Sequence, residues 1–515
     1  MSFIRRHFPV LSSLISTTTL RRHHRHALTA LLMLTSLLTV SAANAAPFAY
    51  LGDRVAATVS VVDMATYATI ATTSLGTGPT APVNVVANKA TNKIVIGKFS
   101  SIAIMDATSN TLIGDIPLGT GPLLYTFGTE SQSLVVANNG KKAYALTAGL
   151  VSVIDLMTKS VVATIAVPPA ASGLALDEDA ETLYVSTGNF SATGTPTIVV
   201  IDTMINEIDT VISTGTLVPL HIAMHPDDNH LYIVGFHNDS TSNMKYAVLD
   251  LATAKLVEVV VTPPAGIPRI GQFNNFVFNA DGSRMFLAPQ TLNMTTIPVL
   301  EINTLNGSVT RVLSVPSGYA DQHDFVKMAA SFADGKFILA FFIAEHLHHY
   351  PAEPPRRVIF VDGISGAIIQ TLIYPSPFNN SAIVGDILDV SAVPVSGKTK
   401  TTTALRASTN PPLRRNIPIT FDATVTGANP TGDVVFQFTD KQEKFTSEIQ
   451  KPAMVKVRRA LVNGTTSLAL PACNARWDNA SLRHVVCANK FSVVVRYPGD
   501  AHNRASRSAV LVETY

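Results

Sequence analysis

One sequence phrase returns seven times along most of the chain, and it limits the possible folds more than any other feature. Each copy is a short run of β-branched and other apolar residues that ends in an acid and is followed by a turn. The acids are Asp63, Asp106, Asp155, Asp202, Asp250, Glu301 and Asp362. Successive copies lie 43, 49, 47, 48, 51 and 61 residues apart. The chain therefore repeats one structural unit of nearly constant length.

Each unit divides into four predicted strands joined by tight turns. Strands are predicted, for example, at Ser172–Leu176, Thr182–Ser186 and Val161–Val167. Asp-Gly and Pro-Asp pairs between them supply the backbone conformations that a hairpin needs. A period in the forties that is made of strands and turns, without a helical pattern, is the signature of β-propeller blades. The sequence therefore predicts an all-β fold with a seven-bladed β-propeller over residues 46–393.

The two ends of the repeat region predict how the ring of blades closes. The chain enters at Phe48–Leu51 with the second strand of a blade, and it leaves with a lone first strand at Ile387–Val393. Pairing of these strands completes the seventh blade and removes open sheet edges, which invite aggregation. Residues 394–400 are predicted to be a linker.

Several segments of the repeat region resemble the YVTN-type propeller repeat. These are LYVSTGN at residues 183–189, VSVIDLMTKSVVATIAV at residues 151–167, and the Gly-x-Gly-Pro turns at residues 76–79 and 119–122. The resemblance extends over nearly all of the repeat region. It implies a fold and not an activity, because the shared residues are structural.

The last part of the chain, residues 401–515, resembles the bacterial immunoglobulin-like repeats of cell-surface proteins. The similar segments are TTTALRAS, NPTGDVVFQF and YPGDAHNRASRSA. This resemblance implies a small immunoglobulin-like β-sandwich domain after the propeller. The segment from Cys473 to Cys487 departs from the pattern and is predicted to be an inserted loop. In an exported chain these two cysteines are predicted to form a disulfide bond.

The first 45 residues have the chemistry of a signal peptide. They contain five arginines and no acid, then the apolar stretch Ala27–Val40, then the small-x-small sequence Ala43-Asn44-Ala45. Such a stretch is too short for a transmembrane helix and fits a cleaved leader. We therefore expect an exported protein, periplasmic or secreted to the extracellular space. No transmembrane anchor is expected in the mature chain, because no later segment reaches 18 apolar residues.

Charge is distributed unevenly between the two predicted domains. Residues 46–400 contain 18 Lys and Arg against 28 Asp and Glu, whereas residues 401–515 contain 15 against 8. An acidic propeller with a basic tail domain does not favour nucleic acid as a partner. The asymmetry permits docking between the two parts, or contact of the tail with an anionic envelope surface. Ordinary solubilising surface charge is the alternative interpretation.

A candidate binding site lies in loops that we expect at the mouth of the central channel. The enlarged loop at residues 344–357 contains His346, His348 and His349, and the preceding connection contributes Asp321, His323 and Asp324. Imidazoles and carboxylates are suitable ligands for a divalent transition metal ion. Arg269 is a candidate for anchoring an acidic ligand at the same mouth. The alternatives are a solvated, histidine-rich surface loop and an ordinary surface arginine.

The other histidines separate by the loops that are expected to carry them. His221 is assigned in or beside a blade-to-blade connection and His237 to a second-to-third-strand loop, both on the channel-mouth side. His225 and His230 are assigned to a first-to-second-strand turn on the opposite side. The repeated acids are not expected to be catalytic. Each ends a strand before a turn, where a carboxylate caps free backbone N–H groups.

The preferred functional interpretation is an exported, non-catalytic binding protein that is a monomer and recognises an unknown protein or envelope component. It requires no cofactor, or at most one divalent metal ion. The alternative is a hydrolase of the lactonase kind with a metal or His/Arg site at the channel mouth. A haem or copper redox protein is a third class. The chain has no C-x-x-C-H motif for haem attachment.

Overall fold

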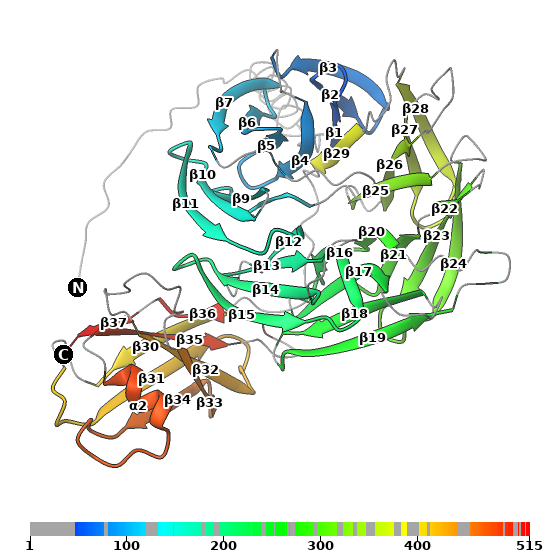
Figure 1. Cartoon of the computed structure of the whole chain (residues 1–515). Coiled ribbons are helices and arrows are strands. Elements are labelled where there is room, and N and C mark those ends of the chain that lie inside the picture. The colour runs from blue at the N-terminus through cyan, green and yellow to red at the C-terminus, as the bar shows by residue number, and fades with distance from the viewer. Residues whose placement is uncertain are drawn as a thin grey trace, which may run out of the picture. The chain divides into compact units, whose positions relative to one another are not determined.

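The computed structural model describes residues 47–514 apart from short gaps. The longer gaps are 124–131, 189–194, 238–243, 268–272, 317–322, 347–355, 375–382, 389–400 and 441–453. Pro47–Tyr515 forms one compact unit, and the predicted signal peptide lies outside the described residues. Almost all regular structure is antiparallel β-sheet, which confirms the all-β prediction (Figure 1). In the part of the chain that the structure describes, no helix is long and apolar enough to cross a membrane.

Within the described residues, the strands between residues 48 and 388 form seven antiparallel sheets. The first contains β29 (Ile383–Leu388), β1 (Phe48–Asp53), β2 (Thr58–Asp63) and β3 (Ala68–Ser74). The second contains β4 (Pro82–Asn88), β5 (Lys93–Lys98), β6 (Ser101–Asp106) and β7 (Thr111–Pro117). The third contains β8 (Leu134–Val136), β9 (Lys142–Thr147), β10 (Leu150–Asp155) and β11 (Ser160–Ala166). The fourth contains β12 (Ala171–Asp177), β13 (Thr182–Thr187), β14 (Thr197–Asp202) and β15 (Glu207–Ser213).

The remaining three sheets repeat this order. The fifth contains β16 (Leu217–Met224), β17 (His230–His237), β18 (Met244–Asp250) and β19 (Lys255–Val261). The sixth contains β20 (Phe273–Phe278), β21 (Arg284–Pro289), β23 (Thr296–Asn303) and β24 (Val309–Pro316). The seventh contains β25 (His323–Ser331), β26 (Ile338–His346), β27 (Arg356–Asp362) and β28 (Ile368–Tyr374), with the short β22 (Thr291–Leu292) at its edge.

The first strands of these sheets contact one another in a closed cycle. The contacts run from β4 to β8 and then through β12, β16, β20, β25 and β29 back to β4. A closed cycle of four-stranded antiparallel sheets is a β-propeller arrangement. The predicted closing pair is present, because β29 is antiparallel to β1 with Leu388 opposite Phe48. This strand begins at Ile383, four residues before the predicted start, because Ile383 and Val384 continue the pairing with β1.

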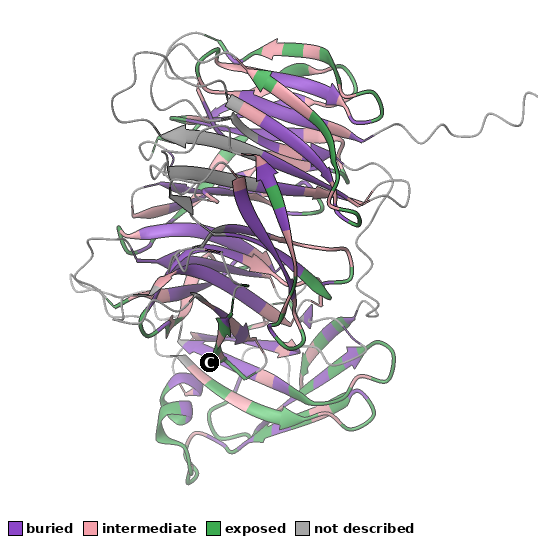
Figure 2. Ribbon diagram, turned by 90° about the vertical axis from the view of Figure 1, so that its right-hand side faces the viewer, coloured by how far each residue is buried: buried purple, intermediate pink, exposed green. Residues whose placement is uncertain are grey.

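Burial follows the order of the strands within each sheet. The second and third strands are almost entirely buried, as in β5 and β6, whereas the fourth strands β3, β7 and β11 have mostly exposed or half-buried residues (Figure 2). Apolar side chains of neighbouring sheets form shared clusters, such as the one that joins Ala49 and Leu51 to Phe360. The two buried faces of each sheet therefore hold adjacent sheets together through apolar burial.

The repeated acids cap the turns that follow their strands, as predicted. The Oδ1 atom of Asp63 accepts hydrogen bonds from the backbone N–H groups of Ala65 (2.7 Å) and Thr66 (3.3 Å). The same pattern occurs at Asp106, Asp155, Asp202 and Asp362. These backbone hydrogen bonds lower the pKa of Asp106, Asp155 and Asp362. Glu301 differs, because it is buried and forms ion pairs with Arg284 and Arg311.

Residues 401–514 form two further sheets with a common core. One contains β30 (Thr402–Ala407), β31 (Ile419–Thr426) and β34 (Thr465–Leu470). The other contains β33 (Met454–Ala460), β32 (Asp433–Asp440), β35 (Lys490–Tyr497) and β36 (Ser506–Arg507), with β37 (Leu511–Thr514) also paired to β35. Their core includes the fully buried rings of Phe421, Phe436, Phe438, Phe491 and Tyr497. This region is a two-sheet β structure.

The predicted disulfide bond between Cys473 and Cys487 is present. The loop that it closes contains the helix α2 (Ala480–Val486), which was not predicted. The Asn479 side chain accepts a hydrogen bond from the Leu482 backbone N–H, and Leu482, Val485 and Val486 are buried. A short helix forms here because its cap and apolar face both fit the domain core.

Basic residues of the last domain form ion pairs with acids of the fourth propeller sheet. Arg496 on β35 contacts Asp202 (3.1 Å) and Asp209 (3.6 Å), and it donates a hydrogen bond to the Thr182 hydroxyl (3.2 Å). Lys456 on β33 contacts Asp209 at 3.0 Å. The side chains of Asp202 and Asp209 are only 1% and 2% exposed. Basic residues of the last domain and acidic residues of the propeller therefore form ion pairs with one another at this contact.

Candidate functional site

Most of the predicted channel-mouth residues lie outside the described residues. Arg269, Asp321, His348 and His349 belong to this group, so their assignment to a site stays a prediction. His323 and Asp324 begin β25, and His346 ends β26. The strand register places His323 opposite His346, and Asp324 opposite Glu345. The two strands thus bring two of the predicted metal ligands to facing backbone positions.

His221 lies within β16 and not in the connection before that strand. It is 4% exposed and packs edge-on against Phe276 with a centroid distance of 4.8 Å. The strand starts at Leu217, and a register shift between Pro219 and His221 accommodates the proline. His221 is therefore part of the core. His237 is the last residue of β17, directly before the second-to-third-strand connection.

A cavity of about 390 Å³ lies among the first strands of the propeller sheets. Its described lining comes from β4, β8, β12, β20, β25 and β29 and from residues beside them. The apolar part includes Val86, Leu134, Val277 and Met328. The polar part consists of Asn84, Gln132, Asn138 and Asp386. Cavities of this size that combine apolar walls with a few polar groups commonly hold small ligands.

Asp386 is the one charged residue among the described residues that line this cavity. Its Oδ2 atom accepts a hydrogen bond from the Ala87 backbone N–H (2.9 Å), and its Oδ1 atom accepts one from the Ile387 N–H (2.8 Å). These bonds hold the carboxylate in place across the β29–β4 junction. Asp386 is not among the predicted site residues, because the closing strand was predicted to begin at Ile387, four residues after its actual start.

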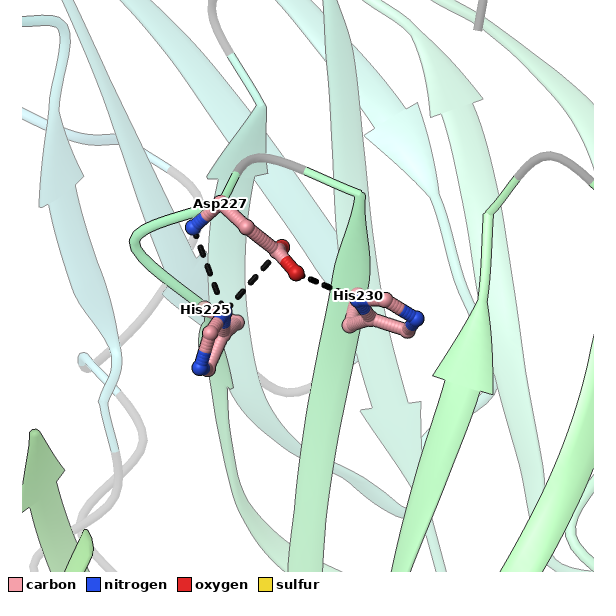
Figure 3. A group of neighbouring side chains, drawn as sticks. All are labelled: His225, Asp227 and His230. Carbon is pink, nitrogen blue, oxygen red and sulfur yellow. Dashed lines mark hydrogen bonds and ion pairs between the residues drawn. The ribbon is translucent and has the colours of Figure 1, made fainter. Parts of the chain in front are cut away.

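A second group of polar side chains lies in the turn between β16 and β17 (Figure 3). The Asp227 carboxylate lies between two imidazoles, with Oδ1 3.1 Å from His225 Nδ1 and Oδ2 2.6 Å from His230 Nδ1. The three side chains are half-buried or nearly buried, with exposed fractions of 11% for His225, 27% for Asp227 and 35% for His230. Burial raises the pKa of Asp227, but the two adjacent imidazoles outweigh it and hold that pKa well below its usual range.

The two histidines lie in the predicted first-to-second-strand turn, but their convergence on Asp227 was not foreseen. The sequence signal is His225-Pro-Asp-Asp-Asn-His230, in which histidines flank an acidic turn. At the sequence level this segment matched an ordinary Pro-Asp turn of the repeat. Only the folded turn shows that ligand atoms of His225, Asp227 and His230 all lie within 4.8 Å of one another.

Comparison with known proteins identified no family, and the likenesses to solved structures are distant. No protein-family model matches the chain, and no curated protein matches it. Among solved structures, the chain is similar to Kuenenia stuttgartiensis hydrazine synthase at 21% identity and a TM-score of 0.42, over 55% of this chain and 76% of that one. It is also similar to the Myceliophteria thermophila Cps50 (Swd1) β-propeller domain at 11% identity and a TM-score of 0.40, over 57% of this chain and 87% of that one. These likenesses concern the fold alone.

Proposed function

We propose that this chain is an exported, non-catalytic binding protein whose propeller holds a small ligand in the cavity at Asp386. The seven sheets are then the seven blades of one YVTN-type propeller, and residues 401–515 are an immunoglobulin-like module. The arginine-rich leader supports export. The observation that carries the binding role is the cavity itself, which combines apolar walls with three amides and one fixed carboxylate.

The lining of the cavity defines the chemistry of the ligand. A fixed carboxylate in the wall of the cavity favours a cationic group or a strong hydrogen-bond donor, and it disfavours an anion. The apolar walls favour a hydrocarbon or aromatic body. We therefore propose a small amine with an apolar body as the class of ligand.

The test compares two probes of similar shape and opposite charge. Calorimetric titration of the full chain with 2-phenylethylamine and with 3-phenylpropionate measures whether the cavity selects the cation. The Asp386→Asn variant is expected to weaken amine binding by at least about tenfold, because a charge-assisted hydrogen bond is lost. Asp281→Asn, in an exposed turn, is the matched control and is expected to bind as the unchanged protein does. Equal binding of both probes, or amine binding that ignores Asp386→Asn, contradicts the proposal.

A lactonase-like hydrolase is the second candidate. The observation that favours it is the register of β25 and β26, which sets His323 opposite His346. Such an enzyme would hold a divalent metal at the channel mouth with these histidines and His348. Its test is lactone hydrolysis by the full chain, before and after the combined substitution His346→Ala and His348→Ala. Hydrolysis that the double variant abolishes supports an enzyme, and absence of hydrolysis by the metal-supplemented chain rejects it.

A further inference from the structure

We propose that His225, Asp227 and His230 form a binding site for a divalent transition metal ion of the zinc type. This site is separate from the cavity at Asp386 and from the channel-mouth histidines, and it does not depend on the proposed ligand. It lies in the turn that joins β16 to β17, and its three side chains approach one another from both ends of that turn (Figure 3).

The donor set and its spacing fit such an ion. Zinc is bound by imidazole nitrogens and carboxylate oxygens at about 2.0–2.2 Å, so neighbouring ligand atoms of a tetrahedral site lie about 3.4 Å apart. The Asp227 carboxylate is 3.1 Å from His225 Nδ1 and 2.6 Å from His230 Nδ1. All three ligand atoms lie within 4.8 Å of one another, so small side-chain movements that open the 2.6 Å contact and close the widest separation would give tetrahedral spacing. Three protein ligands leave the fourth position to water.

The orientation of the His225 ring favours a cation on its Nδ1 side. Its Nε2 atom lies 2.9 Å from the Gly282 carbonyl oxygen, which can only accept, so Nε2 carries a proton. In the neutral ring Nδ1 then presents a lone pair. Its neighbours are the Asp227 backbone N–H at 3.2 Å and the Asp227 carboxylate oxygen at 3.1 Å. That N–H donates to the Nδ1 lone pair, so a metal ion bound at Nδ1 would replace this hydrogen bond, with the adjacent carboxylate as its second ligand.

The surroundings hold this ring as a metal-ligating histidine is usually held. A second-shell carbonyl that accepts the outer N–H fixes the tautomer and the ring plane. The ring stacks on Tyr232 (5.2 Å) and packs edge-on against Phe278 (4.9 Å), so aromatic residues shield it. Gly282 allows the His225 ring to lie in this position, because a Cβ atom on residue 282 would be 2.5 Å from that ring. His225 would bind the ion through Nδ1 and the Gly282 carbonyl through Nε2. It would therefore link the metal site to the turn before β21.

The experiment measures metal directly and assigns it by substitution. The full chain, purified without a histidine tag, is analysed for bound metal by mass spectrometry and titrated with Zn²⁺, with Co²⁺ absorption as a second readout. We expect one equivalent of tightly bound ion and a tetrahedral Co²⁺ spectrum. His230→Gln and Asp227→Asn are expected to weaken Zn²⁺ binding by more than about 100-fold, beyond the usual effect of second-shell changes. Circular dichroism of each variant verifies that it is folded.

Two controls make the assignment decisive. His484→Gln changes an exposed histidine of α2 and is expected to leave binding unchanged. The combined His346→Ala and His348→Ala variant removes the channel-mouth candidates and is also expected to retain the ion. If the ion disappears in that variant and persists in His230→Gln, the metal belongs to the mouth and the proposal is wrong. Zn²⁺ titration without saturation likewise overturns the proposal.

Discussion

Arg496→Met is the substitution that best tests how the last domain is attached to the propeller. In the structure the guanidinium faces two buried carboxylates, Asp202 at 3.1 Å and Asp209 at 3.6 Å, and is itself 15% exposed. Removing one partner of a buried ion pair costs about 3–5 kcal/mol, because the remaining charge is left without compensation. We expect the lower end, about 3 kcal/mol, since Lys456 still pairs with Asp209.

The assay uses the single tryptophan of the chain, Trp477, which lies in the last domain. Its fluorescence during urea unfolding reports on that domain, and a double-mutant cycle with Asp202→Asn isolates the pairwise energy. We expect a coupling of about 1.5–3 kcal/mol, whereas Arg459→Met, on the exposed face of β33, is expected to cost less than about 0.5 kcal/mol. A coupling below about 0.5 kcal/mol would refute the reasoning, because it would equal that of a solvent-exposed pair.

Three further predictions address the stability of the two domains. Phe360 is fully buried between the first and seventh sheets. Phe360→Ala is expected to lower the free energy of unfolding by about 3–5 kcal/mol, measured by urea unfolding followed by circular dichroism. A decrease below about 1 kcal/mol would argue against that packing. Replacing Cys473 and Cys487 by serine is expected to lower the unfolding free energy of the last domain by about 3 kcal/mol, measured by Trp477 fluorescence, and an unchanged midpoint would contradict it. Burial raises the pKa of Glu513 above its ordinary value of 4.5, so the folded state holds its proton more tightly and stability falls as the pH rises through 4.5 toward the raised pKa. Glu513→Gln is therefore expected to be more stable than the unchanged chain at pH 7 and to lose this advantage at pH 4, whereas equal stability at pH 7 would show that burial does not penalise the carboxylate.

The repeat made the propeller predictable because its signal is carried by the backbone. The strand pattern, the acid before the turn and the spacing recur in the same order in every unit. Each unit therefore supports the same strand assignment in the others. The caps at Asp63 and Asp155 have the predicted role, and the closing pair of β29 with β1 exists. The exact start of β29 was missed, because a lone strand has no neighbouring copy that fixes its bounds. The helix α2 was missed for a related reason, since its segment matches no repeat.

The candidate sites were harder to predict, because they depend on side chains that meet only after folding. Asp386 and Asn84 are separated by most of the chain, and the cavity appears only when β29 and β4 become neighbours. His225 and His230 are close in sequence, but their turn resembles the structural turns of the other units. Histidine-rich composition instead directed attention to residues 344–357, where abundance of imidazoles is not evidence of convergence.

In this chain, both proposed sites lie where a unit departs from the repeat. The turn after β16 replaces a plain Pro-Asp hairpin with one flanked by two imidazoles, and the closing strand adds a carboxylate to a cavity that is otherwise apolar or amide-lined. Asp202 keeps its repeat role through Oδ1 and uses Oδ2 for Arg496. A residue such as Asp202 both caps its own turn and contacts a residue outside its unit, so a substitution there removes two interactions. Substitutions at such positions should therefore affect domain attachment or binding, whereas the same substitution at Asp106 should affect only its own turn.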